Sequence, residues 1–431
     1  MHKRIITLIL AAIVVLFSSC MEINTTVKET IPKKNTNKSN SIKINKKKID
    51  EDIVLSPYYE PIVLDTGYNC LDTDDERRLY NGIVEHAADY DDGSMDSDGN
   101  YVITTFTLDN CSLTSKEVSK VFFAIELDKP DFFWLANPYS YSVTGNSFSL
   151  SISSPFTYEQ YEKYRGQLNS VINSVLKGLK PDMSELEREL YIHDYLVKNC
   201  VYKDKADDND NRYTIYGCLV EQSAVCEGYK NAFQQLLAYC GIKSYGVSGS
   251  LDDSDNVDHV WNAVRIDGEY YHTDVTWDDA EDMVMYDYFN LTNKEIKHTH
   301  SIAEMFDDIP DSTDFSGATV KSYNLIVPDC KSEKYNYYRY FGSKVKSMAD
   351  NTIAEDLAKA AENHDDFFYI SVGKKLNYTT TYDQLFSDDI FLFAGYIDDA
   401  NSILGSDVLQ TSVSVLKRKW LRTIIVALKY N

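Results

Sequence analysis

The sequence predicts an α+β protein in which a helix carrying a cysteine packs on an antiparallel sheet carrying a histidine and an aspartate. Residues 223–240 have the apolar spacing and the end signals of a helix. Residues 259–277 form two alternating runs joined by Asp-Gly, which is typical of a hairpin. Helical and strand-like segments also alternate on both sides of this core, so we expect α+β regions at both flanks.

The cysteine helix is expected to start at Ser223, whose hydroxyl can cap it, and to end at Gly241, which suits a left-handed C′ position. Cys226 would then lie in the first turn, where unpaired N–H groups and the helix dipole favour a thiolate. Gly228 would let another backbone or a substrate come close. Taken alone, Cys226 fits a buried structural cysteine equally well. The apolar stripe is formed by Tyr229, Phe233, Leu236, Leu237 and Cys240.

The predicted hairpin supplies a histidine and an aspartate that could act together with Cys226. If the turn closes at Asp267-Gly268, His259 faces Thr276 across the two strands. His259 and Asp274 then share a face as diagonal neighbours, about 7 Å apart at Cβ, which an imidazole and a carboxylate can bridge. A thiolate nucleophile, an imidazole that takes and returns a proton, and a carboxylate that fixes its tautomer form a complete set for nucleophilic catalysis.

Three segments of this region resemble the motifs of the transglutaminase-like superfamily: Ala224–Tyr229, His259–Asn262 and Asp274–Asp278. Their order and spacing are similar to those of its bacterial, extracellular branch. The resemblance covers residues 181–300, with weaker similarity at Pro130–Leu135 and Pro328–Tyr338. It implies a papain-like transglutaminase core with Cys226 as the nucleophile, His259 as the base and Asp274 as the orienting acid.

Other site residues are predicted less directly. The Cys226 N–H is one expected oxyanion donor, and the side chain of Gln222 or Tyr216 is a candidate for the second. Trp277 falls on the opposite strand face from His259 by parity. The candidates for lining the substrate site are Trp261, Tyr270, Gly228 and Tyr229.

No cofactor or metal is expected. His298 and His300 form an H-x-H pair, but the sequence indicates no third ligand beside them. Six cysteines remain besides Cys20 and Cys226, and the sequence does not choose among their pairings.

The N-terminus predicts export. Lys3 and Arg4 precede the apolar run Ile5–Phe17, which is shorter than a membrane-spanning helix, and Ser18–Cys20 resembles a bacterial lipobox, although Phe17 holds the place where Leu is usual. We expect Cys20 to be lipidated, with ordinary secretion as the alternative. The expected organisation is a signal peptide (1–20), a disordered basic tether (21–55), an N-terminal α+β region (56–180), the catalytic core (181–305) and a C-terminal α+β domain (306–431).

Outside the core we expect helices at 72–90, 114–127, 158–177, 184–199, 352–363 and 382–386. Strands are expected at 101–108, 132–135, 147–152, 367–372 and 420–430.

The formal net charge of −24 argues against nucleic-acid binding, because phosphates would be repelled. The expected function is extracellular, cysteine-dependent acyl transfer on peptide, protein or cell-wall peptide amides, by a protein held to the membrane through Cys20. The flanking loops 248–258 and 278–287 are acidic, so they would attract a cationic amine, which favours transfer, and would also admit water, which favours hydrolysis. These effects oppose each other, and water is only slightly favoured as the acceptor. The alternative is a non-catalytic module that binds peptide or cell wall.

Overall fold

The computed structural model describes residues 52–90, 94–135, 140–203, 211–252, 258–279, 284–310, 323–349, 352–387 and 389–431. The expected signal peptide, Cys20 and residues 21–51 of the tether lie outside these ranges. The chain divides into two compact units, each described by itself below. The first contains residues up to Tyr270 together with 274–284 and 299–329, and the second contains 271–273, 285–298 and 330–431. None of the described helices is long and apolar enough to cross a membrane.

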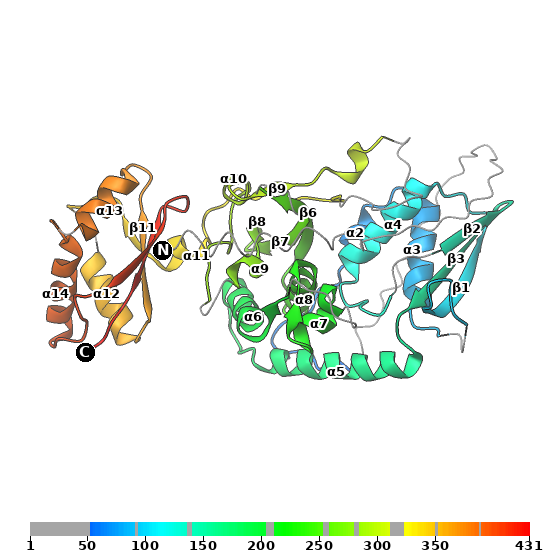
Figure 1. Cartoon of the computed structure of the whole chain (residues 1–431), viewed down its shortest axis with the longest axis horizontal. Helices are drawn as coiled ribbons and strands as arrows, with labels where there is room; N and C mark the ends of the chain where they lie inside the picture. The colour runs from blue at the N-terminus through cyan, green and yellow to red at the C-terminus, as the bar shows by residue number, and fades with distance from the viewer. Residues whose placement is uncertain are drawn as a thin grey trace. The chain divides into compact units, whose positions relative to one another are not determined.

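The described part of the first unit begins with three helices and a small sheet (Figure 1). Helices α3 and α4 lie within the expected helical ranges 72–90 and 114–127 to within one residue and start at capping boxes, Thr73 with Glu76 and Thr114 with Glu117. Residues 132–135 were expected to be a strand and are instead turns, in which the Trp134 indole donates to the Ala87 carbonyl at 2.7 Å. The antiparallel strand order is β1-β3-β2. The elements are α2 (Thr66–Asn69), α3 (Asp74–His86), β1 (Tyr101–Asp109), α4 (Ser115–Asp128), β2 (Ser140–Thr144) and β3 (Ser147–Ser154).

The rest of the first unit forms the core that carries the site. Helix α8 is buried along almost its whole length and packs against strands β6 and β7 of a four-stranded sheet of order β8-β7-β6-β9. This is the expected α+β arrangement of a cysteine helix on an antiparallel sheet. The helices are α5 (Tyr158–Lys177), α6 (Glu185–Asn199), α7 (Ile215–Leu219), α8 (Cys226–Tyr239) and α9 (Val275–Asp278). The strands are β4 (Val201–Tyr202), β5 (Ser223–Ala224), β6 (Ser244–Leu251), β7 (Asp258–Ile266), β9 (His300–Ile302) and β8 (Glu269–Thr273), of which residues 271–273 are assigned to the second unit.

The register of this sheet sets the positions of the site residues. Strand β6 pairs antiparallel with β7, so that Gly249 lies opposite His259, and with β9, so that Leu251 lies opposite His300. The turn after β7 has positive φ at both Asp267 (48°) and Gly268 (86°), as the expected two-residue hairpin requires.

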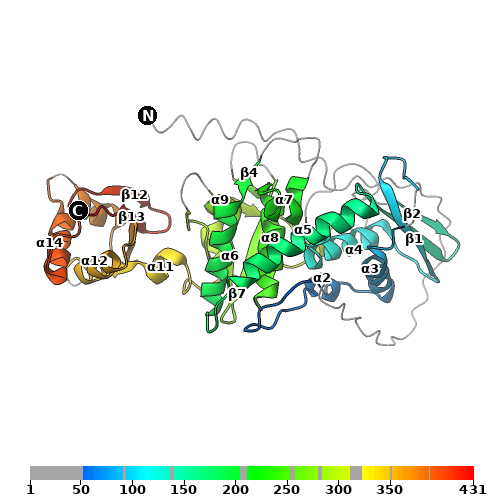
Figure 2. The same cartoon turned by 90° about the horizontal axis from the view of Figure 1, so that it is seen from below.

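The second unit has a four-stranded sheet of order β10-β11-β13-β12, seen with its helices in Figure 2. A C-terminal domain was expected from residue 306. Strand β9 and the 2.8 Å bond between Lys120 and Asp307 instead tie residues 300–309 to the first unit, and the second unit resumes at Cys330. Its elements are α10 (Asn293–Ile296), α11 (Tyr337–Phe341), β10 (Ser343–Val345), α12 (Ile353–Glu362), β11 (Phe367–Val372), α13 (Tyr378–Phe386), α14 (Leu392–Leu404), β12 (Ser414–Arg418) and β13 (Thr423–Ala427).

Candidate active site

Cys226 is the first residue of helix α8, and the N-cap before it is Val225, which provides no side-chain cap. The expected cap at Ser223 is wrong, because Ser223 pairs with Val201 in the short parallel ladder of β4 and β5. The first N–H groups of a helix have no acceptor within it, and an apolar N-cap supplies none. The first amides of α8 therefore receive no acceptor from the N-cap side chain, and the Cys226 N–H stays the expected oxyanion donor.

Gly228 and Tyr229, two of the candidates for lining a substrate site, serve the chain's own packing instead. A Cβ on Gly228 would lie 2.6 Å from the carbonyl oxygen of Arg212, so the backbone that comes close is internal. Tyr229 is fully buried, and its hydroxyl donates to the Asp279 carboxylate. Neither residue is placed to form a wall against a substrate.

His259 lies on β7 and connects the cysteine to the acid. Its Nε2 is 2.7 Å from Asp274 Oδ2, and its side chain is also hydrogen-bonded to Cys226. Only 1% of Cys226, 5% of His259 and 1% of Asp274 is exposed, so the three groups interact in a region from which bulk water is excluded. Their mutual attraction is therefore screened much less than at the surface.

The charges of this group follow from its surroundings. Burial lowers the pKa of His259, but the charge and hydrogen bond of Asp274, followed by those of Cys226, outweigh it and raise the pKa to about 10. Burial raises the pKa of Asp274, yet the nearby His259 and the hydrogen bonds from His259 and His300 hold it well below its usual range. The folded protein therefore favours an imidazolium beside a carboxylate.

Asp274 is held by a short helix and not by a strand. Strand β8 ends at Thr273, and Asp274 caps α9, with Oδ1 accepting from the N–H groups of Thr276 (3.0 Å) and Trp277 (3.2 Å). The expected pairing of His259 with Thr276 across the sheet is therefore wrong, because a capping aspartate starts a helical turn there. For the same reason Trp277 does not point away from the site, and its ring centroid lies 6.2 Å from that of His259.

The C-terminal end of α9 makes hydrogen bonds to two helices. Asp278 is fully buried and lies 3.2 Å from Nε2 of His193 on α6, while Asp279 accepts from Tyr229 on α8. Burial lowers the pKa of His193, but hydrogen bonds and charges from Asp194 and Asp278 raise it to about 9. At Asp278 the expectation of a hydrated acidic loop is thus wrong, because this acid is part of the packing that positions Asp274.

The remaining predicted residues are scattered. The Tyr216 hydroxyl donates to Gln167 at 2.8 Å and is thereby occupied, whereas Gln222 has an exposed side chain and stays a prediction as an oxyanion donor. Trp261 is 1% exposed, and its ring packs against His259 and His300. It therefore packs behind the histidines and does not line a surface open to a substrate. Tyr270 bonds to Tyr245 at the hairpin end of the sheet and is not part of the site.

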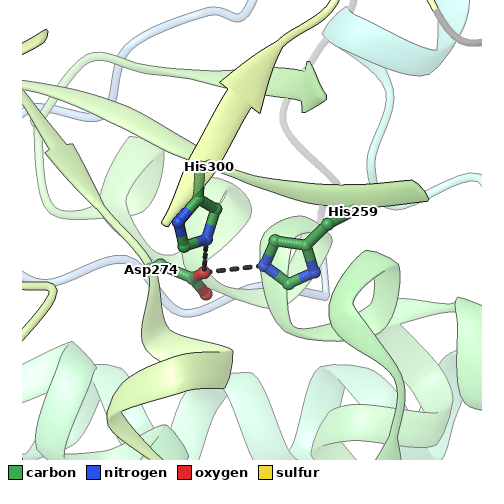
Figure 3. A group of neighbouring side chains, drawn as sticks. All are labelled: His259, Asp274 and His300. Atoms are coloured by element: carbon green, nitrogen blue, oxygen red, sulfur yellow. Dashed lines mark hydrogen bonds and ion pairs between the residues drawn. The ribbon is translucent and has the colours of Figure 1, made fainter. Parts of the chain in front are cut away.

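His300 is the residue that the sequence analysis missed. Figure 3 shows its ring and that of His259 meeting at the Asp274 carboxylate, where His300 Nε2 is 3.0 Å from the same Oδ2 atom. Ligand-type atoms of these three side chains all lie within 4.8 Å of one another. The H-x-H pair was visible in the sequence, but nothing in it indicated that His300 would reach Asp274.

Part of the chain matches a known protein family. Residues 173–275 match the family model of the transglutaminase-like superfamily. The chain carries a transglutaminase-like domain. The mixed helix-and-sheet architecture of the core, with a cysteine at a helix start and a histidine bonded to an aspartate, is consistent with that match.

The chain is also similar to curated proteins and to solved structures. It is 24% identical over 210 residues to the mouse (Mus musculus) protein named kyphoscoliosis peptidase, covering 44% of this chain and 31% of that protein. The human (Homo sapiens) protein of that name is 23% identical over 204 residues, covering 43% and 29%. The chain thus spans about a third of the length of these relatives.

Two solved structures are similar over part of the chain. The first is described as a TGase, with 16% identity, a TM-score of 0.23 and coverage of 46% of this chain and 56% of that one. The second is described as a candidate cysteine protease from Cytophaga hutchinsonii, with 11% identity, a TM-score of 0.22 and coverage of 43% and 70%.

Proposed function

We propose that this protein is a cysteine-dependent enzyme that transfers acyl groups from amides of peptides, proteins or cell-wall peptides through a thioester on Cys226. One observation carries the proposal. A buried hydrogen-bonded chain runs from Cys226 through His259 to Asp274, at the start of a helix whose first amides have no side-chain cap. A cysteine with a purely structural role would need neither the neighbouring imidazole nor a helix start without a side-chain cap.

The proposed reaction has two balanced steps. The Cys226 thiolate attacks the amide carbonyl, forming a C–S bond, and the developing oxyanion accepts a hydrogen bond from the Cys226 N–H. The C–N bond then breaks as the His259 imidazolium gives its proton to the departing amine. In the second step His259 takes a proton from the acceptor, which attacks the thioester, and Cys226 leaves as the thiolate. Asp274 keeps the imidazole oriented throughout.

We propose water as the preferred acceptor, so that the enzyme acts mainly as a peptidase or amidase. The support is that the curated relatives are named as peptidases. The acidic loop that begins at Asp278 gives less support to water as the acceptor than the sequence suggested, because Asp278 is buried and bonded to His193.

The test is a competition between water and an amine. The full-length protein is incubated with glutamine-containing and general peptides and an excess of a labelled primary amine, and hydrolysed and labelled products are quantified by mass spectrometry. Hydrolysis that outpaces labelling, and that disappears in Cys226→Ala, is the expected result. Labelling that outpaces hydrolysis would make the protein a transglutaminase in the strict sense, and no turnover with any peptide would leave binding as the function.

We also propose that the protein is exported and held at the outer face of a bacterial cell membrane by a lipid on Cys20. The support is the charged start, the short apolar run Ile5–Phe17 and the small residues before Cys20.

A further inference from the structure

We propose that His300 is a positioning residue of the cysteine site, which as a neutral imidazole holds the Asp274 oxygen that His259 uses. This inference rests on the proposed function of Cys226. His300 begins strand β9, at the edge of the sheet, and is fully buried. Its Nε2 lies 3.0 Å from Asp274 Oδ2, and His259 Nε2 lies 2.7 Å from the same atom (Figure 3).

The hydrogen bonds around Asp274 determine which tautomer His300 must have. An ionised carboxylate only accepts, so His300 has to carry a proton on Nε2. Its other nitrogen, Nδ1, lies 2.8 Å from Thr299 Oγ1, and a hydroxyl can donate to it. A neutral ring with hydrogen on Nε2 satisfies both contacts at once, and Thr299 fixes that tautomer.

With His300 in place, the carboxylate of Asp274 is fully used. Oδ1 accepts from the backbone N–H groups of Thr276 and Trp277, and Oδ2 accepts from the two imidazoles. A carboxylate has about four acceptor positions, so all are filled. Removing His300 would leave the His259 ring as the remaining side-chain donor to Oδ2. The carboxylate would then rotate more easily about its Cβ–Cγ bond.

The charges facing His300 explain why a neutral histidine suits this place. They come from His259 on β7, Asp274 at the start of α9 and Asp252 after β6. Burial, together with repulsion from His259, lowers the pKa of His300, although Asp274 and Asp252 oppose this. The ring is further enclosed by Trp261 and Trp277, whose centroids lie 5.0 and 4.9 Å away. His300 therefore adds a hydrogen bond without adding a second cation that would compete with the His259 imidazolium.

A metal ion held by His259, Asp274 and His300 is the rival explanation of the same cluster. The separations of 2.7 and 3.0 Å from Oδ2 are those of hydrogen bonds between the side chains themselves. A tetrahedral zinc with bonds of about 2.0–2.1 Å would hold its ligand atoms about 3.3 Å apart. Both pairs would have to separate, and His259 would no longer be free to exchange a proton with Cys226, so the distances favour the positioning role.

The test uses alkylation of Cys226 and needs no substrate. The rate of its modification by iodoacetamide is measured from pH 5 to pH 10 by peptide mass spectrometry in the full chain. His300→Leu should slow the reaction at pH 6 by about 10- to 100-fold, as expected for losing a hydrogen bond to a charged group. The pH of half-maximal rate should also move upward. His300→Gln places an amide N–H near the Nε2 position and should restore most of the wild-type profile.

Controls separate this role from packing. His298→Leu changes a nearby exposed histidine that stacks on Trp420 and should leave the alkylation profile unchanged. Circular dichroism establishes that each variant is folded. A wild-type profile in His300→Leu, or equal losses in the Leu and Gln variants, would overturn the proposal. So would stoichiometric zinc in the purified protein whose removal by a chelator speeds alkylation. If alkylation responds as expected and no peptide is turned over, the proposed function fails while the role of His300 stands.

Discussion

Replacing His193 by glutamine tests whether a buried imidazolium holds helix α9, and with it Asp274, in place. His193 and Asp278 are both fully buried and 3.2 Å apart. The pKa of His193 rises from 6.5 to about 9 on folding, because its bonds to Asp194 and Asp278 outweigh the cost of burial. At about 1.4 kcal/mol per pKa unit, this shift corresponds to about 3 kcal/mol of stability.

The direction of the pH dependence follows from the raised pKa. A group of this kind contributes its full stability below the unfolded pKa of 6.5 and loses it as the pH rises through about 9. The loss of unfolding free energy in His193→Gln should therefore be about 3 kcal/mol at pH 6 and should shrink steadily towards pH 10. The raised pKa of His259 is common to both proteins and cancels in the difference.

The assay is urea-induced unfolding followed by tryptophan fluorescence at several pH values. His86→Gln is the matched control, because His86 makes a similar 2.8 Å contact with Asp89 at the surface, where the acid is 59% exposed. That variant should change stability by less than about 1 kcal/mol. A penalty in His193→Gln that stays constant from pH 6 to pH 10 would refute the reasoning, since folding would then leave the pKa of His193 unchanged.

Three further outcomes are expected. In the native protein, iodoacetamide should modify Cys226 below pH 7 before Cys111 or Cys240, because burial raises the pKa of each of those two thiols to about 12; peptide mass spectrometry decides the order. Tyr229→Phe should lower kcat more than it changes KM, because Asp279 loses its hydroxyl donor and α9 is no longer held to α8 by this hydrogen bond. An equal kcat in both proteins would show that this contact does not position α9. Cys20→Ala, expressed in a bacterial host, should release or mislocalise the protein, and a lipid-free mature N-terminus mapped elsewhere in the wild type would exclude the anchor.

The sequence predicted those parts of the fold whose signals are local. Helix α5 has its expected bounds because Thr157 and Gln160 form a capping box at its start. The hairpin turn forms at Asp267-Gly268 because both residues tolerate positive φ. The hairpin signal brought His259 close to Asp274, which lies 2.7 Å away, whereas Cys226 lies at a helix start although the cap expected at Ser223 does not form.

What the sequence could not predict depends on long-range pairing. Strand β6 (Ser244–Leu251) places Tyr245, Val247 and Leu251 at alternate positions, but such an alternation does not say which strands pair with it, so its place between β7 and β9 was not foreseen. The contact of His300 with Asp274 follows from that strand order. The contact of His193 with Asp278 joins residues 85 positions apart, and no periodicity in either segment indicates it.

The apolar N-cap of helix α8 implies that a substitution at position 225 that raises stability would lower activity. A serine or aspartate at an N-cap typically stabilises a helix by about 1 kcal/mol over an apolar residue, and Val225 forgoes this. Such a side chain would engage the first amides of the helix and set its own oxygen beside the forming oxyanion. Engineering that optimises helix caps to obtain a more heat-resistant version of this protein should therefore exclude position 225, because the stabilising choice there would cost turnover.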